Sequence, residues 1–321
     1  MRIHLVALDG LFDTGLATLL DVFTAVNDLA EATGKRSARF EVTVVGMRKV
    51  VKTGQGLTVP VVPAGRLSRP DVAVVVALGA KRPEDVRAAL SRPDVQDAGD
   101  AIAAWSKGGT LLGAACTGTF VLAATGLLDG ERATTTWWLA PLFRELHPRV
   151  TLEESRMVAF SSRFVTAGAA LAHLDLALWL VRRVSPSLAA LAARYLLMDD
   201  RASQAAYAIP GQTAHEDELV ARFERWARKR LALGFSLEEA ASAAGTSPRT
   251  LARRLDAVLG KSPLSYFQDL RVERAVHLLR SKDTSLERIA GEVGYADAAT
   301  LRALLRRKLG RGVRELRAST G

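Results

Sequence analysis

The first 190 residues alternate short apolar runs with longer stretches in which apolar residues recur at helical spacing. The short runs predict five strands, at residues 3–8, 40–45, 72–77, 110–115 and 163–166. The longer stretches predict helices between and after them, at 16–32, 83–90, 97–107, 119–127 and 170–184. Strands that alternate with helices are typical of a doubly wound α/β fold around a parallel sheet. The pattern therefore predicts an α/β domain over residues 1–199.

The last third of the chain has a different pattern, because one helical unit occurs twice. Residues 237–245 recur as 286–294, with leucine, alanine and glycine at the same places, and residues 250–260 recur as 300–310. Each copy predicts a helix, a short turn and a second helix. Two such units in register predict a pair of helix-turn-helix motifs in an all-α domain, which we place at 217–321.

Helix ends in this repeat are marked by capping residues. Ser236 and Ser285 are predicted N-caps, and Gly245 and Gly294 are predicted to turn the chain with positive φ. Residues 263–281 between the two units predict one long amphipathic helix. At about 1.5 Å per residue it spans about 28 Å, so the second helices could enter successive major grooves about 34 Å apart.

The stretch between the two regions breaks both patterns. Aspartate, serine, glutamine, proline and glycine interrupt the apolar periodicity there, and residues 200–216 are the predicted linker. A new helix is expected over 216–233.

Composition is that of an ordinary globular protein, with 49% hydrophobic and 24% charged residues. Cys116 is the only cysteine, which excludes an intrachain disulfide and a cysteine-rich zinc site and suits the cytoplasm. The uncharged stretch 108–128 is long enough to cross a membrane, but its five glycines favour a buried strand, turn and helix. We expect no membrane segment, no metal and no cofactor.

Basic residues are concentrated toward the C-terminus. Residues 215–321 contain 21 lysines and arginines against 14 acidic residues, a net charge of +7 out of +10 for the chain. Such a concentration is typical of a domain that binds phosphates. A well-solvated helical surface is the alternative, and charge alone does not distinguish the two.

The repeat region resembles the DNA-binding domain of the AraC/XylS family. The residues that carry the resemblance are KSPLSYFQDLRVERAVHLLR at 261–280 and SLERIAGEVGY at 285–295. The resemblance covers about 217–317 and implies a monomeric seven-helix unit with one recognition helix per motif. It implies base contacts at Arg249, Ala252 and Arg253 in the first motif, and at Ala298, Ala299, Arg302 and Ala303 in the second. We expect Thr250, Arg306 and Arg307 to contact the DNA as well.

The chemistry of these two sets is unequal. Arg249 and Arg253 can each donate two hydrogen bonds to a guanine edge, which is worth about 1–3 kcal/mol of discrimination. The alanines of the second motif can offer only methyl contacts, to thymine for example. We therefore expect the first helix to supply most base specificity, and Arg302, Arg306 and Arg307 to grip the phosphate backbone.

Cys116 follows an apolar run, and Thr117 and Gly118 open a helical stretch, as a nucleophile at a strand-to-helix turn would be placed. Free backbone N–H groups at the helix start would lower the pKa of the thiol. Catalysis also needs a base within reach. A triad of Cys116, His173 and Asp175 can be written, but residues i and i+2 of a helix face apart, so a structural role for His173 is favoured.

Residues 115–138 and 164–181 resemble the DJ-1/PfpI, glutamine amidotransferase-like domain, which is flavodoxin-like. More narrowly they resemble the version fused to AraC-type motifs in the GlxA-type transcriptional regulators, over about residues 3–195. In hydrolytic relatives a histidine follows the cysteine, where this chain has Thr117. Related regulators have ATTHW where residues 133–137 read ATTTW, so Thr136 replaces a second histidine. Both departures weigh against catalysis.

The remaining residues suit a binding site. We expect a small polar pocket that an aromatic side chain covers, lined by Asp13, Gly79, Cys116, Thr117, Gly118, Thr136 and Trp137. The alternative is a vestigial site that is retained for packing and dimerisation.

The leading hypothesis is a transcriptional regulator, not an enzyme, that senses a small metabolite or dimerises through its first domain. Its expected partners are double-stranded DNA, a small-molecule effector, a second copy of the chain, and RNA polymerase if it is an activator. The rival hypothesis is a hydrolase or amidotransferase that uses Cys116 as nucleophile. A redox sensor is a third, although the chain has no second cysteine to resolve an oxidised thiol.

Overall fold

A computed structural model of the chain describes residues 1–34, 39–198, 201, 203–204, 217–281, 284–310 and 312–318. The chain divides into two compact units, residues 1–204 and 205–321, and each is described by itself. The predicted domain bounds stay a prediction, because most of the predicted linker 200–216 lies outside the described residues.

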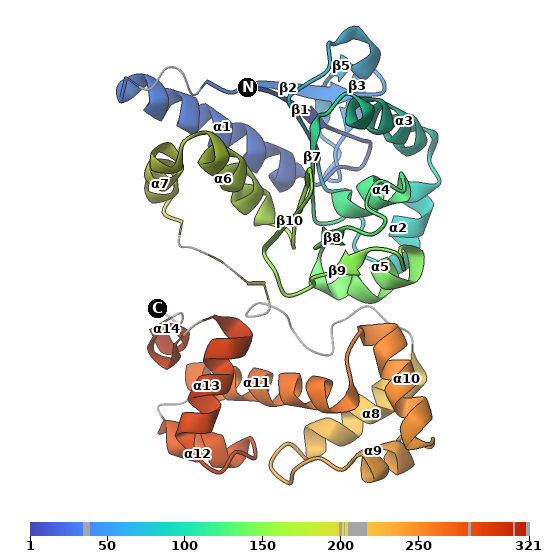
Figure 1. The fold of residues 1–321 in the computed structure, drawn as a ribbon, viewed down its shortest axis with the longest axis vertical. Coiled ribbons are helices and arrows are strands. Elements are labelled where there is room, and N and C mark those ends of the chain that lie inside the picture. Colours follow the sequence, from blue (N-terminus) through green and yellow to red (C-terminus); the bar gives the residue numbers. More distant parts are fainter. Residues whose placement is uncertain are drawn as a thin grey trace. The chain divides into compact units, whose positions relative to one another are not determined.

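The N-terminal unit is built on a seven-stranded sheet with helices on both faces (Figure 1). The strands lie in the order β10-β11-β7-β6-β1-β2-β5, and only β10 runs antiparallel to its neighbour within this sheet. Their bounds are β1 Arg2–Val6, β2 Glu41–Gly46, β5 Val62–Pro63, β6 Val72–Val75, β7 Leu111–Ala115, β10 Val158–Ser161 and β11 Phe164–Ala167. The predicted parallel, doubly wound fold is confirmed, and the five predicted strands are β1, β2, β6, β7 and β11.

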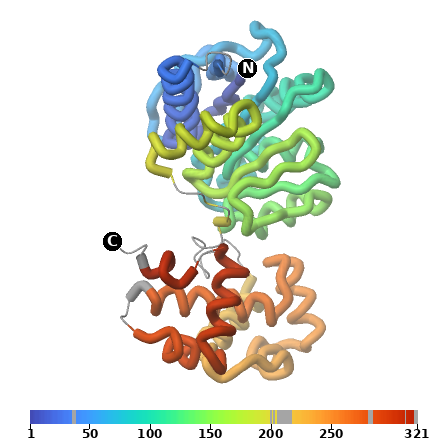
Figure 2. The backbone as a smooth tube through the Cα atoms, turned by 60° about the vertical axis from the view of Figure 1, so that its left-hand side comes forward, coloured from blue at the N-terminus to red at the C-terminus, as the bar shows by residue number. Residues whose placement is uncertain are grey.

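Two layers of helices cover this sheet (Figures 1 and 2). One face carries α1 (Asp13–Ala32), α6 (Ala172–Val184) and α7 (Pro186–Tyr195). The other carries α2 (Pro83–Leu90), α3 (Pro93–Lys107), α4 (Gly118–Ala124) and α5 (Ala140–Leu146). Because both faces are covered, the central strand β6 is apolar throughout, and all four of its residues are buried.

The predicted helices of this unit are all present, with ends displaced by up to four residues. The sequence patterns missed α5 and α7, in which proline occupies the first turn. They also missed the edge strands β5 and β10 of the main sheet and further short elements, which are β3 (Val50–Lys52), β4 (Thr58–Pro60), β8 (Arg132–Ala133), β9 (Thr151–Leu152) and the 3-10 turns Ala64–Arg66 and Trp137–Leu139. Such pieces depend on tertiary contacts more than on local periodicity.

No helix within the described residues is long and apolar enough to cross a membrane. The uncharged stretch 108–128 contains β7, a tight turn and α4 instead, as predicted.

The described part of the C-terminal unit is all helical and contains seven helices. They are α8 Glu218–Lys229, α9 Leu237–Ala243, α10 Pro248–Leu259, α11 Pro263–Ser281, α12 Leu286–Glu292, α13 Ala298–Leu309 and α14 Val313–Ala318. α11 has the predicted bounds and contributes to two apolar cores. Phe267 and Leu270 pack with α8, α9 and α10, whereas Ala275 and Leu278 pack with α12, α13 and α14. Each copy of the repeat thus has its own core.

The capping predictions in this unit are confirmed. Ser236 Oγ accepts a hydrogen bond from the backbone N–H three residues on (3.2 Å), and Ser285 Oγ does the same (3.3 Å). Gly245 and Gly294 adopt φ of 69° and 78°, the left-handed region that favours glycine. The sequence repeat therefore corresponds to two helix-turn-helix motifs, α9–α10 and α12–α13.

Candidate functional site

The turns after β1 and β6 meet at one edge of the sheet. β1 pairs with β2 on one side and β6 on the other, so the strand order reverses between β1 and β6. Leu11 forms a bridge with Leu78, and the Gly79 N–H donates to the Gly10 carbonyl at 2.6 Å. In open α/β sheets this switch point is where ligands bind.

Cys116 lies in the adjacent turn, between β7 and α4, in a strained conformation. Its φ is 52°, a left-handed value that non-glycine residues rarely adopt. The Thr117 hydroxyl donates to the Leu78 carbonyl at 2.7 Å, which ties this turn to the switch point. At Gly118 a Cβ atom would lie 2.5 Å from the Val75 carbonyl oxygen, so only glycine fits. The predicted strand-to-helix turn is confirmed, and we call residues 115–118 the Cys116 elbow.

The environment of the Cys116 thiol favours its neutral form. The side chain is buried, and burial raises its pKa above the ordinary range. The N–H groups of Ala170 and Thr117 and the hydroxyls of Thr136 and Thr117 oppose this shift without reversing it. The expectation of a lowered pKa is therefore wrong, because desolvation outweighs the donors at the start of a seven-residue helix.

Two polar atoms near these turns have no hydrogen-bond partner within the described residues. Thr136 is fully buried, and among the described residues its Oγ1 has no oxygen or nitrogen partner and faces only the Cys116 thiol, which is a weak hydrogen-bonding group. Asp13 accepts from the Gln55 N–H through Oδ2 (3.1 Å), but its buried Oδ1 is unpartnered. An unsatisfied buried polar atom costs about 1–3 kcal/mol, so each is a place where a bound polar group would be stabilised.

His173 is fully buried and its two ring nitrogens are both occupied by the backbone. Nδ1 donates to the Ala170 carbonyl (2.6 Å), and Nε2 accepts from the Ala77 N–H (3.3 Å). Burial lowers the pKa of His173 to about 4, so the ring is neutral at pH 7. Asp175 forms an ion pair with Arg201. The structural role predicted for His173 is confirmed.

The predicted pocket residues are distributed over the turns around the switch point. Cys116, Thr117, Gly118 and Thr136 come together at the elbow, while Asp13 and Gly79 belong to the neighbouring turns. Trp137 is half-buried and makes an edge-to-face contact with Trp138, with ring centroids 5.5 Å apart.

Sequence reasoning missed two contributors to this elbow. Thr135 donates to the Cys116 carbonyl at 2.7 Å, and the Ala170 N–H lies at the thiol. The run of three threonines at 134–136 could have indicated Thr135, but no feature of the sequence indicates Ala170.

The second helix of each motif, α10 or α13, presents a polar face opposite its core. In α10, Arg249 and Arg253 are exposed, and Thr250 and Ala252 are half-buried. The repeat offset aligns Arg249 with Ala299 and Arg253 with Ala303, and both alanines are exposed on α13. The two helices therefore offer different chemistry at equivalent places.

The burial of Ala298 in α13 does not fit its predicted role as a DNA contact. It is only 7% exposed and belongs to the second core, because the first turn of the helix packs inward there. Its methyl group stabilises the core rather than facing outward.

Ion pairing separates the basic side chains of α10 and α13 into two groups. Within the described residues, Arg249 and Arg253 make no ion pair, whereas their neighbour Arg254 pairs with Asp217. On α13, Lys308 pairs with Asp269 at 2.8 Å. Arg302, Arg306 and Arg307 are exposed and have no ion pair among the described residues; Arg307 lies near enough to Tyr295 to favour its phenolate.

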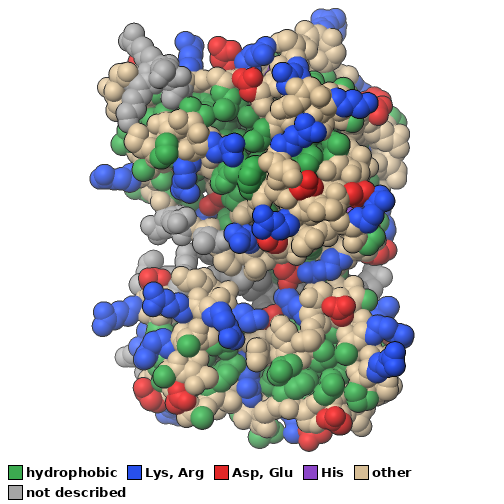
Figure 3. Space-filling model, viewed as in Figure 1, with side chains coloured by type: hydrophobic (Ala, Val, Ile, Leu, Met, Phe, Trp, Pro, Cys, Tyr) green, Lys and Arg blue, Asp and Glu red, His purple; other side chains and the backbone are tan. Residues whose placement is uncertain are grey.

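Lysine and arginine side chains are distributed over the whole visible face of the molecule (Figure 3). Charge density alone therefore does not locate an interface. The exposed arginines of α10 and α13 that have no ion pair among the described residues can bind phosphates or base edges without first breaking an internal ion pair.

The fold and the elbow together define the class of the protein. The model of the DJ-1/PfpI family matches residues 1–183, more than half of the chain, and the chain belongs to the DJ-1/PfpI family. Residues 240–319 match a second model, described as a helix-turn-helix domain. The chain combines a DJ-1/PfpI domain with a helix-turn-helix domain of the AraC type.

Curated proteins of similar sequence are transcriptional regulators. The HTH-type transcriptional regulator GbdR of Pseudomonas aeruginosa is 30% identical over 200 residues, which cover 60% of this chain and 53% of that one. GlxA of Rhizobium meliloti is 28% identical over 201 residues, covering 60% and 61%. The chain therefore spans less than two thirds of the length of these relatives.

Solved structures support the fold of the N-terminal unit. An AraC family transcriptional regulator from Pseudomonas putida is similar at 22% identity with a TM-score of 0.50, covering 61% of this chain and 98% of that one. Drosophila melanogaster DJ-1beta is similar at 17% identity with a TM-score of 0.50, covering 62% and 98%. At such identities the likeness concerns the fold alone.

Proposed function

We propose that the protein is a transcriptional regulator that binds duplex DNA through its C-terminal unit and senses a small metabolite at the Cys116 elbow. It acts in the cytoplasm as a homodimer, and as an activator it would contact RNA polymerase. The observation that carries the proposal is the pair of helix-turn-helix motifs with unpaired, exposed arginines on their second helices.

The two second helices have different tasks in this proposal. Arg249 and Arg253 of α10 contact base edges, with Thr250 and Ala252 beside them. Arg302, Arg306 and Arg307 of α13 bind phosphates, with Ala299 and Ala303 close to the bases. Arginine at the first pair of positions and alanine at the equivalent second pair support this division.

DNA binding can be tested by fluorescence anisotropy of a labelled duplex titrated with the full chain at several salt concentrations. We expect the logarithm of the affinity to fall linearly with the logarithm of the salt concentration, by about 0.9 per phosphate contact. Replacing Arg249, Arg253, Arg302 and Arg306 together by alanine should remove most of the affinity and most of this slope.

A double variant of two paired cations, Arg254→Ala with Lys308→Ala, is the matched control. It removes two positive charges from the same helices but leaves the unpaired arginines in place, so binding should weaken only slightly. Losses in proportion to the number of charges removed, four against two, would show that net charge, and not this surface, determines binding. Absence of any binding to duplex DNA would contradict the proposal.

The elbow supports binding rather than catalysis. Thr117 stands where hydrolytic relatives have a histidine, and both ring nitrogens of His173 are occupied. The thiol of Cys116 is held neutral by burial. The unpartnered oxygens of Thr136 and Asp13 support recognition of a small polar ligand there, with Gly79, Thr117, Gly118 and Trp137 as the remaining contacts.

A thermal-shift screen of amino acids, amines and carboxylates on the full chain tests this sensing role. A binding compound should raise the unfolding temperature of the wild type, and the increase should shrink in Thr136→Val, which removes the unpartnered hydroxyl at nearly constant volume. Turnover of a substrate that is lost in Cys116→Ser would instead favour the enzyme.

A further inference from the structure

Gln204 is a buried polar side chain at the end of the N-terminal unit. It is 2% exposed, and the C-terminal unit begins with the next residue. A buried amide is tolerated only when its hydrogen bonds are made. The position of Gln204 is therefore fixed by its partners in the N-terminal unit.

Those partners satisfy the whole side chain. The two N–H groups of Nε2 donate to the carbonyls of Thr135 (2.8 Å) and Glu154 (2.7 Å), and the hydroxyl oxygen of Thr134 shares one of them at 3.2 Å from the nitrogen. Oε1 accepts from the Ala169 N–H at 2.9 Å. Three acceptors around Nε2 and one donor at Oε1 leave a single orientation of the amide.

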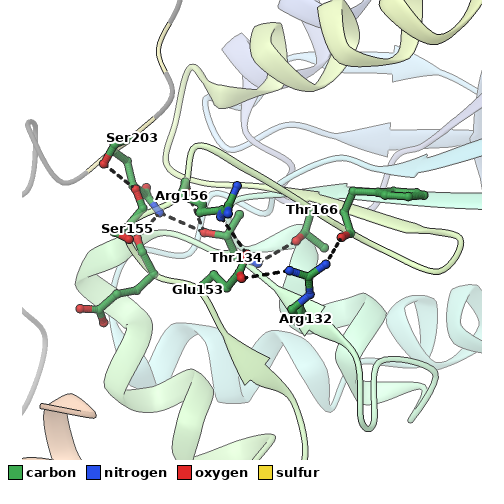
Figure 4. A network of polar contacts seen from close by, with 10 residues as sticks. Arg132, Thr134, Glu153, Ser155, Arg156, Thr166 and Ser203 are labelled. Carbon is green, nitrogen blue, oxygen red and sulfur yellow. Dashed lines mark hydrogen bonds and ion pairs between the residues drawn. The ribbon is translucent and has the colours of Figure 1, made fainter. Parts of the chain in front are cut away.

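The backbone around Gln204 is docked on the same surface. Its N–H donates to the Ser155 carbonyl at 2.9 Å, and the Ser203 hydroxyl donates to the same carbonyl at 2.8 Å. Ser203 also forms an antiparallel bridge with Arg156. Figure 4 shows Ser203 and Ser155 in one polar network with Thr134, whose N–H donates to the Thr166 hydroxyl at 2.7 Å.

The same partners build the Cys116 elbow. Thr135, which accepts from Gln204, donates to the Cys116 carbonyl. Ala169, which donates to Gln204, precedes Ala170, whose N–H lies at the Cys116 thiol. Gln204 thus binds Thr135 and Ala169, and each of these residues directly precedes one that faces the sulfur, Thr136 or Ala170.

The turn at 168–170 is shaped around this side chain. A Cβ atom on Gly168 would overlap Gln204 Oε1, so glycine makes room for the amide. Ala170 adopts a φ of 29°, a left-handed value that costs a non-glycine residue free energy. The hydrogen bond from Ala169 to Gln204 helps to hold that strained turn in place.

We propose that Gln204 is a latch between the Cys116 elbow and the chain that leads into the C-terminal unit. A group bound at the elbow that displaces Thr135 or the 168–170 turn removes the partners of Gln204 and frees the segment at 203–204. By reciprocity, freeing Gln204 loosens the elbow. This inference rests on the proposed function, because it states how sensing would reach the DNA-binding unit.

The single cysteine allows the latch to be tested in the full chain without knowledge of the ligand. In Gln204→Glu the carboxylate cannot donate to the Thr135 and Glu154 carbonyls and repels both. We expect N-ethylmaleimide to modify Cys116 about tenfold faster or more in this variant, which corresponds to about 1.4 kcal/mol. Ser203→Ala, which removes a hydrogen bond of the same segment remote from the elbow, should change the rate by less than about twofold.

The effect of the elbow on the segment at 203–204 is measured by limited trypsin digestion with mass spectrometry. Wild-type protein modified at Cys116 should be cleaved after Arg201 about tenfold faster than unmodified protein. In Gln204→Glu, modification should change that cleavage little, because the segment is already free.

Gly168→Ala provides a second variant in which Gln204 itself is unchanged. Its added methyl should push the amide out and reproduce the faster modification of Gln204→Glu, while circular dichroism verifies that both variants are folded. Wild-type rates of modification and cleavage in both folded variants would overturn the latch.

Duplex DNA affinity, measured on the same proteins, separates this inference from the proposed function. Coupled modification and cleavage in a chain that binds no DNA would support the latch and contradict the proposed function. Normal DNA binding with modification and cleavage independent of each other would overturn the latch alone.

Discussion

Burial of His173 predicts a specific dependence of stability on pH. The folded-state pKa is about 4, whereas an unperturbed histidine titrates near 6.5. The unfolded chain therefore binds a proton at pH values where the folded chain does not. Stability is complete above pH 6.5 and is lost as the pH falls from 6.5 toward 4.

The magnitude follows from the two pKa values. At pH 4.5 the unfolded histidine is almost fully protonated, whereas about a quarter of the folded molecules carry the proton. The linkage relation then gives a loss of about 2.5 kcal/mol between pH 7.5 and 4.5 from His173 alone. His173→Gln can keep both backbone hydrogen bonds but cannot titrate, so this variant should lose about 2.5 kcal/mol less than the wild type over that interval.

Urea denaturation of the full chain at a series of pH values measures this difference. Tryptophan fluorescence is a suitable signal, because four of the five tryptophans lie in the N-terminal unit. His147→Gln is the matched control. Burial also lowers the pKa of His147, but its side chain is only half-buried, so its replacement should reduce the pH dependence less. Identical pH profiles for wild type and His173→Gln would refute the reasoning.

Three further predictions concern single positions. In thermal unfolding, Gly118→Ala should destabilise the N-terminal unit by about 3 kcal/mol, because its Cβ would meet a backbone oxygen at 2.5 Å. Gly99→Ala in α3, whose added Cβ would have its nearest contact at 3.6 Å, should be neutral or stabilising. The reverse order of stabilities would contradict the packing. Asp217→Ala should cost the C-terminal unit about 1–2 kcal/mol in urea denaturation, because it removes the α8 cap and the partner of Arg254, and unchanged stability would contradict this. Alkylation of Cys116 by iodoacetamide should be slow at pH 7.5 and still accelerating above pH 9, and a plateau below pH 8 would be inconsistent with a raised pKa.

Features encoded by local sequence could be predicted. The serine caps and positive-φ glycines of the repeat are set by neighbouring residues, so the two motifs of the C-terminal unit followed from the pattern. The alternation of apolar runs likewise gave the five parallel strands. The elbow at Cys116 was predictable because threonine and glycine follow an apolar strand.

Features that depend on contacts between distant segments could not be predicted. The pKa of Cys116 is set by burial among segments up to 54 residues away, and the sequence suggested the opposite direction. The burial of Ala298 depends on how α13 packs in its core. Gln204 has no local pattern, since its partners lie 35 to 70 residues earlier in the chain.

Sequence preference is the most direct test of the central claim that α10 recognises bases and α13 holds the backbone. Duplexes selected from a random library by the full chain would be compared, base by base, with those selected by Arg249→Ala, Arg253→Ala and the double variant Arg302→Ala with Arg306→Ala. We expect each single variant to lose preference at one or two positions, at a cost of about 1–3 kcal/mol, and the double variant to bind all duplexes more weakly with its preference intact. An unchanged preference in both α10 variants, or a preference altered by the α13 variant alone, would contradict the account.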